Sequence, residues 1–87
     1  MVSQKTTIKN LTGLSVRPAG LFCETAVNFT SKVTFRYKDT LGNAKSVLNV
    51  LGAGVKSGDE IEIICEGDDE AEALAEMLRV IEDRLGE

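Results

Sequence analysis

The last third of the chain carries the pattern that most constrains its fold. Residues 60–65, Glu-Ile-Glu-Ile-Ile-Cys, alternate polar and apolar side chains in a way that is typical of a half-buried strand. After residue 69, apolar residues recur at the spacing of one helix face, at Leu74, Met77, Leu78, Ile81 and Leu85. Asp69 and Glu72 have the spacing of a capping box, so we expect the helix to begin there and Gly86 to end it.

Two further helices are predicted, and each begins after a serine. Ser15 is expected to cap a helix that has Arg17 and Pro18 in its first turn. The buried face of this helix is expected to carry Ala19, Phe22, Ala26 and Phe29. Ser46 is expected to cap a short helix over residues 47–51, which the following glycines end.

Three more segments are predicted as strands. Residues 6–8 are β-branched, residues 32–37 alternate polar and apolar, and residues 39–43 combine a turn with a short return strand. The order is therefore β-α-β-β-α-β-α, with no linker and no internal repeat. We expect an α+β sandwich in which helices cover one face of an antiparallel or mixed sheet.

The composition bounds the class of protein. With 87 residues, the chain is expected to form a single domain, 1–87. A net charge of −4 argues against direct nucleic-acid binding. Cys23 and Cys65 lack the spacing of metal or redox sites. The polar start carries no signal peptide, and no apolar run is long enough to span a bilayer. We therefore expect a cytoplasmic protein with no membrane insertion, no metal and no cofactor.

Two motifs carry a resemblance to a known family. Residues 12–19, Thr-Gly-Leu-Ser-Val-Arg-Pro-Ala, resemble the phosphorylation loop of HPr, the histidine-containing phosphocarrier of the bacterial sugar phosphotransferase system. In that family the loop reads Gly-(Leu/Ile)-His-Ala-Arg-Pro-Ala. Residues 43–48, Asn-Ala-Lys-Ser-Val-Leu, resemble its second signature, whose serine is a regulatory phosphorylation site. The resemblance covers the whole chain and implies the HPr-like open-faced β-sandwich, a four-stranded antiparallel sheet covered on one face by three helices.

The resemblance places Ser15 where the family carries its phosphorylated histidine, and this chain contains no histidine. Imidazole titrates near neutral pH, and its phosphoramidate can pass the phosphoryl group onward. A serine hydroxyl instead needs an adjacent base to become a nucleophile, and it forms a stable phosphate ester. The chain therefore resembles an HPr scaffold without the HPr reaction, and we expect neither a catalytic residue nor an enzyme activity.

Three residues at the start of the first predicted helix are candidates for partner binding. Ser15 is open to three interpretations: a plain N-cap, which we prefer, a phosphate acceptor at the positive helix end, or a nucleophile that lacks a base. Arg17 could bind an anion or an acidic partner, as the family arginine does, or be a solvated surface residue. Gly20 could keep the surface beside Ser15 low, or simply be tolerated.

Ser46 is the better functional candidate, and the resemblance favours a regulatory phosphorylation site there. A phosphate would meet the positive end of the short helix, so modification need not unfold the protein. It would also change the electrostatic potential beside an apolar patch of Val47, Leu48 and Leu51, which we expect to bind a partner. The alternative is a capping serine beside core residues.

The resemblance implies a regulatory protein similar to the catabolite-repression HPr-like proteins, which also lack the active-site histidine. HPr kinase/phosphorylase would phosphorylate Ser46, and the modified protein would bind a LacI-type transcription regulator or a metabolic enzyme in carbon catabolite regulation. One alternative is a phosphocarrier, either a divergent one that accepts phosphate on Ser15 from enzyme I or a trapped variant of a protein with histidine there. Another is a non-catalytic decoy that docks on enzyme I or sugar permease components and competes with HPr.

Overall fold

The computed structural model describes residues 1–86 and confirms the predicted order of elements. The strands are β1 (Val2–Thr7), β2 (Lys32–Tyr37), β3 (Thr40–Asn43) and β4 (Glu60–Glu66). The helices are α1 (Val16–Val27), α2 (Val47–Ala53) and α3 (Glu70–Asp83). Among the described residues, no helix has both the length and the apolar character that a membrane span requires.

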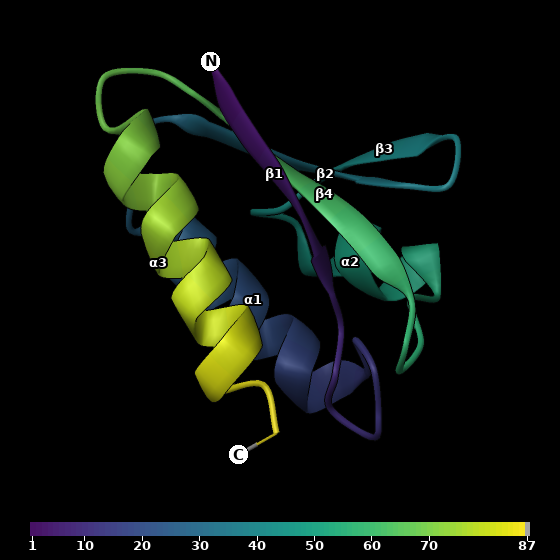
Figure 1. Cartoon of the computed structure of the whole chain (residues 1–87). Coiled ribbons are helices and arrows are strands. Elements are labelled where there is room, and N and C mark those ends of the chain that lie inside the picture. The colour runs from purple at the N-terminus through teal and green to yellow at the C-terminus, as the bar shows by residue number, and fades with distance from the viewer. Residues whose placement is uncertain (87) are drawn as a thin grey trace.

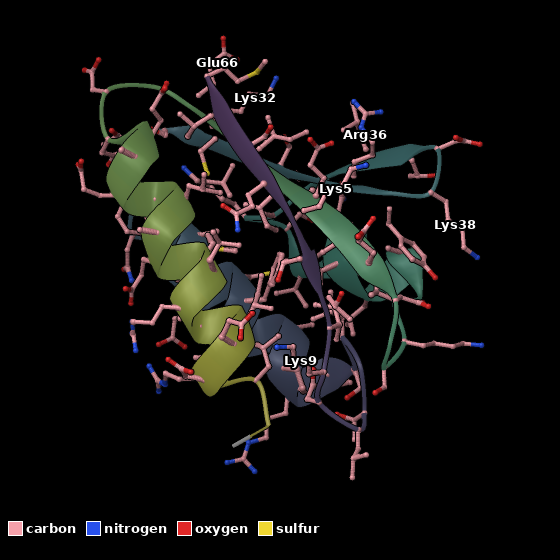
Figure 2. The ribbon with its side chains drawn as sticks, in the orientation of Figure 1. Lys5, Lys9, Lys32, Arg36, Lys38 and Glu66 are labelled. Carbon is pink, nitrogen blue, oxygen red and sulfur yellow. The ribbon has the colours of Figure 1, made fainter. Side chains whose placement is uncertain are left out.

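The four strands form one sheet in the order β1-β4-β2-β3, and all three strand pairs are antiparallel. This result excludes the mixed sheet that the sequence pattern alone left open. The alternation in β4 decides which face is buried, because Ile61, Ile63 and Cys65 all lie in the core. The helices lie on that face of the sheet (Figure 1). Lys5 and Arg36 project from the strands on the opposite face, away from α1 and α3 (Figure 2).

The core lies between the sheet and the helices. Phe22 of α1 meets Phe35 of β2 edge to face, with ring centroids 6.0 Å apart, a geometry that aromatic pairs favour. The side chains that α3 buries are Ala73, Met77, Val80 and Ile81. Cys23 and Cys65 are free thiols in this core, and burial raises the pKa of both. Both therefore stay protonated at neutral pH and pack as small apolar side chains.

The first helix ends earlier than predicted. Val27 is the last residue of α1, so Phe29 lies beyond the helix, half-buried against the core. The amides of Asn28 and Phe29 donate to carbonyls three residues back, at 3.2 and 3.3 Å. Such bonds tighten the last turn of a helix and satisfy carbonyls that would otherwise lack partners. The prediction that Phe29 belongs to the helical face is therefore wrong, although its ring still packs on the core.

The last helix also ends early, at Asp83 rather than at Gly86. The amides of Arg84 and Leu85 both donate to the carbonyl of Val80, at 2.9 and 3.2 Å. Because two successive amides share one carbonyl, the backbone leaves the helical path at this point. Leu85 nevertheless remains buried, as the periodicity predicted, because the chain turns back over the core.

The start of the last helix differs from the predicted capping box. Asp69 is the N-cap of α3, but its side chain makes no capping hydrogen bond within the described residues. Its carboxylate instead accepts from the amides of Thr30 and Ser31, both at 2.9 Å, and from the Ser31 hydroxyl. These bonds, the one from the Ser31 hydroxyl foremost, lower the pKa of Asp69 to about 2. One half of a capping-box pattern forms two residues earlier, where the Gly67 amide donates to Glu70 Oε1 at 3.1 Å.

Candidate functional site

The loop before α1 is held against the segment that follows α2. The amide of Leu14 donates to the carbonyl of Val55 at 3.0 Å. Gly13 has φ +62°, and a Cβ there would lie 2.5 Å from the same carbonyl oxygen and 2.8 Å from Lys56 Cα. Glycine is the residue that tolerates both this backbone angle and this approach. The loop therefore presents the exposed Ser15 at a fixed place beside the end of α2.

Ser15 occupies the N-cap position of α1, and its carbonyl accepts from the amide of Ala19 at 2.8 Å. The predicted hydroxyl cap is wrong, however, because within residues 1–86 the side chain makes no capping hydrogen bond. An N-cap side chain accepts from the amide of the second or third helical residue. The third residue of α1 is Pro18, which has no amide hydrogen. The Ser15 hydroxyl is therefore exposed at the positive end of the helix, without a capping bond in the described part of the chain.

Arg17 lies between two shallow surface hollows beside the start of α1. One hollow is lined by Ser15 and Arg17, the other by Arg17 and Gly20, and Leu85 contributes to both. Figure 1 shows the segment after α3 running beside α1. A Cβ at Gly20 would meet no atom within 4 Å in the described protein, so internal packing does not require glycine there. The structure thus brings the three predicted residues together at one exposed end of α1.

Ser46 caps α2, as predicted. Its Oγ accepts from the amide of Asn49 at 3.2 Å and from Asn49 Nδ2 at 3.1 Å. Asn49 Oδ1 in turn accepts from the amide of Asn43, the last residue of β3, at 3.0 Å. The side chain of Asn49 therefore links the end of the strand to the cap of the helix. Ser46 is half-buried, and its oxygen is held by this link.

The second helix presents apolar side chains next to Ser46. Leu48 is 81% exposed and Val47 is 42% exposed, whereas Val50 points into the core. Leu51 is half-buried and packs against core residues. We call Val47, Leu48 and Leu51 the α2 patch. Its exposed members, Val47 and Leu48, are neighbours, and adjoining exposed apolar residues mark a contact surface more often than scattered ones do.

The two serine sites share one helical layer but lie toward its opposite ends. Lys45, which precedes α2, donates from Nζ to the carbonyl of Phe29, which follows α1, at 2.7 Å. At the other end, Val55 follows α2 and bonds Leu14, which precedes α1. The two helices pack together and therefore run in opposite directions. Because Ser15 lies at the start of α1 and Ser46 at the start of α2, the two serines lie at opposite ends of this pair of helices.

The arrangement offers contact surfaces and little catalytic chemistry. A serine attacks only when a base takes its proton. The sequence contains no histidine, and no carboxylate in the described part of the chain is hydrogen-bonded to the Ser15 hydroxyl. The described residues also contain no group of three or more Cys, Asp or Glu side chains that could hold a metal ion. Binding, with modification by another protein, is the chemistry that these residues support.

Three features of the site escaped the sequence analysis. Pro18 was noted as a helix starter, but its place three residues after Ser15 already removes the usual capping amide. Asn49 lies three residues after Ser46, but its side chain also contacts Asn43 at the end of β3. That contact depends on how the chain turns between β3 and α2, which local sequence patterns do not predict. Leu11 is 96% exposed in the loop before α1 and adds apolar surface near Ser15, and a single loop leucine gives no periodic signal.

Comparison with known proteins relates the chain to phosphotransferase proteins. The family model "PTS HPr component phosphorylation site" matches residues 2–83. The "HPr-like protein Crh" of Bacillus subtilis (strain 168) is 36% identical over 85 residues, which cover 98% of this chain and 100% of that relative. The "Phosphocarrier protein HPr" of Treponema pallidum (strain Nichols) is 34% identical over 88 residues, which cover 100% of this chain and 99% of that relative.

Solved structures share the fold. The crystal structure of HPr-C-His from Thermoanaerobacter tengcongensis matches with a TM-score of 0.96 and 39% identity, covering 100% of this chain and 98% of that chain. The crystal structure of Bacillus subtilis Crh matches with a TM-score of 0.76 and 37% identity, covering 95% of each chain. The predicted four-stranded antiparallel sheet with three helices on one face is thus confirmed.

Proposed function

The chain belongs to the HPr family, and we propose that within it this chain is a regulatory binding protein, not a relay that passes phosphate through histidine. The observation that carries the proposal is at position 15, where the resemblance places the phosphorylated histidine. The chain has serine there and no histidine at any other position. The exposed Ser15 hydroxyl has no base bonded to it in the described residues, and a phosphoserine ester would be too stable to pass its phosphoryl group on.

Ser46 is the proposed point of control. Its hydroxyl lies at the start of α2, directly before the exposed Val47 and Leu48. Phosphorylation would add about two negative charges at neutral pH beside the α2 patch. Charges at the rim of an apolar contact change which partners associate and how fast. HPr kinase/phosphorylase with ATP is the proposed source of the phosphate.

The proposed partner surface has two parts. The start of α1 supplies Ser15, Arg17 and Gly20, where the guanidinium would pair with acidic groups of a partner. The α2 patch supplies apolar side chains that would anchor the contact. A LacI-type transcription regulator is the proposed partner of the phosphorylated protein in carbon catabolite regulation, and enzyme I or sugar permease components are the alternatives.

The test is the intact mass of the protein after incubation with HPr kinase and ATP. We expect one added phosphate on the wild type and on Ser15→Ala, and none on Ser46→Ala. The phosphorylated protein should then bind a LacI-type regulator more tightly than the unmodified protein, and Arg17→Ala should weaken that binding. Equal labelling of wild type and Ser46→Ala would place the modified residue elsewhere and remove Ser46 from the proposal.

A phosphocarrier role is the second candidate, and the exposed hydroxyl of Ser15 beside Arg17 favours it. Incubation with phosphoenolpyruvate and enzyme I separates the two candidates. Labelling that disappears in Ser15→Ala would establish Ser15 as a phosphate acceptor and overturn the preferred function. Binding to enzyme I without labelling would instead indicate a decoy that competes with HPr.

A further inference from the structure

We propose that Asn49 is a positioning residue that holds the Ser46 hydroxyl in its capped state and slows phosphorylation of that hydroxyl. The inference rests on the proposed function of Ser46 and names a further residue that regulates the same site. Its basis is that one residue supplies two donors to one oxygen. The amide of Asn49 lies 3.2 Å from Ser46 Oγ, and Asn49 Nδ2 lies 3.1 Å from it.

The two donors occupy the acceptor capacity of the hydroxyl. A serine hydroxyl has one O–H donor and two lone pairs. With one lone pair facing the Asn49 amide and the other facing Nδ2, none is left for bond formation with phosphorus. One of the two hydrogen bonds must therefore break before the oxygen can attack. The bond from the backbone amide belongs to the start of α2, so the side-chain bond is the one that can break without unwinding the helix.

The carboxamide of Asn49 is itself anchored, which makes this bond harder to break. Its Oδ1 accepts from the amide of Asn43 at 3.0 Å, so rotation of the side chain breaks two hydrogen bonds at once. The corner around it is braced as well. Asn43 Oδ1 accepts from the amide of Lys45 at 2.9 Å, and the carbonyl of Asn43 accepts from the amide of Ser46 at 3.0 Å. The Asn49 side chain is thus oriented with its nitrogen toward Ser46.

The step that this contact opposes is transfer of the γ-phosphoryl group of ATP to Ser46. A bond forms between Oγ and the γ-phosphorus, and the bond from that phosphorus to the β–γ bridging oxygen breaks. ADP leaves, and the hydroxyl proton passes to a base of the kinase. Only the attacking oxygen belongs to this chain, so the chain acts on the step by making that oxygen more or less available.

Loss of the carboxamide should therefore accelerate the reaction. A net hydrogen bond of the ordinary strength corresponds to a rate change of about two- to twelvefold. We expect Asn49→Ala to be phosphorylated faster than the wild type by about this factor. The change should lie mainly in kcat, since the contact restrains the reacting oxygen, and KM should move little.

A second substitution separates this role from a general effect on helix stability. Asparagine lies between alanine and glycine in helix propensity, so Asn49→Ala strengthens α2 and Asn49→Gly weakens it. If the rate followed helix stability, the two variants would change it in opposite directions. If the carboxamide is the restraint, both variants react faster. Asn43→Ala is the matched control, because it removes a neighbouring side-chain bond in the same corner and leaves both donors to Ser46 Oγ in place.

The experiment measures initial rates of phosphate addition by intact mass, with HPr kinase and ATP, for the wild type, Asn49→Ala, Asn49→Gly, Asn43→Ala and Ser46→Ala. Faster labelling of both Asn49 variants, with Asn43→Ala at the wild-type rate, would support the inference. Labelling of both Asn49 variants with no phosphate on the wild type or on Asn43→Ala would support it as well. Equal or slower labelling of Asn49→Ala, or opposite changes in the two Asn49 variants, would overturn it and leave the proposed function standing. No phosphate on any of the proteins, with the kinase active on an HPr substrate, would overturn both.

Discussion

Ser15 and Ser46 are the same residue type in the same position, the N-cap of a helix, and both have extended backbone angles. Their side chains nevertheless behave differently. Ser46 Oγ accepts from the amide of Asn49, the third residue of its helix. The third residue of α1 is Pro18, which has no amide hydrogen to give, and within the described chain the Ser15 side chain makes no capping bond. The residue three positions after the serine thus decides whether the hydroxyl of an N-cap serine accepts a capping bond or stays free of one.

This difference sorts the two serines by the role that each can play. An uncapped hydroxyl at an exposed helix start can turn toward a partner without breaking an internal bond. A capped hydroxyl must first give up hydrogen bonds that contribute to the stability of the protein. We therefore regard Ser15 as part of a contact surface, and Ser46 as a site whose modification is coupled to local structure.

The largest effect should come from Gly13→Ala, which disturbs only the Ser15 end of the helical layer. The new Cβ would lie 2.5 Å from the carbonyl oxygen of Val55, at a φ of +62°. Alanine at this position would have to adopt a left-handed backbone conformation and displace the segment at Val55. The substitution should therefore lower the free energy of unfolding by about 2–4 kcal/mol. Urea unfolding measures the change.

Gly20→Ala is the matched control, because its Cβ meets no atom within 4 Å in the described protein. Alanine is a better helix former than glycine, so this variant should be more stable than the wild type by up to about 1 kcal/mol. Equal stability of the two variants would mean that the loop before α1 is not pressed against Val55.

Asp69 extends the comparison to a third N-cap, whose side chain bonds a distant part of the chain. Its carboxylate accepts from the amides of Thr30 and Ser31, and the pKa of Asp69 falls from 3.8 to about 2. A lowered folded-state pKa means that the contribution to stability is present above about pH 4 and is lost as the pH falls toward 2. Asp69→Asn should be less stable than the wild type at pH 7, with a smaller effect than Gly13→Ala.

The measurement for Asp69 is urea unfolding of wild type and Asp69→Asn from pH 7 down to pH 2. The difference between the two proteins should shrink over the acidic part of that range, as the wild-type carboxylate takes up a proton. A constant difference across the whole range would show that the amide, not the charge, accounts for the change.

The sequence predicts the elements of this fold well because periodicity is a local property. The alternation of residues 60–65 follows from one face being buried, and the structure buries Ile61, Ile63 and Cys65. The helical spacing from Leu74 to Ile81 locates α3, but Leu74 and Leu78 are only half-buried, and the buried face also includes Ala73 and Val80. The ends of the helices are harder to predict, because they depend on which carbonyl each amide finds. The carbonyl of Val80 accepts from the amides of both Arg84 and Leu85, and the spacing of apolar residues does not predict these two hydrogen bonds.

The candidate site divides in the same way. Ser46 could be predicted as a cap because its donor is three residues away in sequence. The partners of Asp69 could not be predicted, because Thr30 and Ser31 lie far from it along the chain. The missing cap at Ser15 could be predicted from the sequence, because Pro18 lies three residues after Ser15 and proline has no amide hydrogen.

Ser46→Ala should cost about 1 kcal/mol in the free energy of unfolding, within the range of about 0.5–2 kcal/mol for loss of an N-cap side chain. The substitution removes the acceptor for both the amide and the side chain of Asn49. Urea unfolding gives the value, and amide exchange should show faster opening at the start of α2. No change in either measurement would mean that the cap contributes nothing in solution.

The smallest change in the free energy of unfolding should come from Ser15→Ala. The hydroxyl accepts no capping bond in the described chain, so its removal should change the free energy of unfolding by less than about 0.5 kcal/mol, as at ordinary surface positions. The same unfolding experiment that finds a loss of about 1 kcal/mol for Ser46→Ala serves as the internal standard. A loss of similar size at Ser15 would show that its hydroxyl accepts from the amide of Arg17 in solution, and that proline at the third helical position does not abolish the cap. With little or no loss, the Ser15 hydroxyl contributes nothing measurable to folding, and a partner could contact it without any loss of stability, as the proposed function requires.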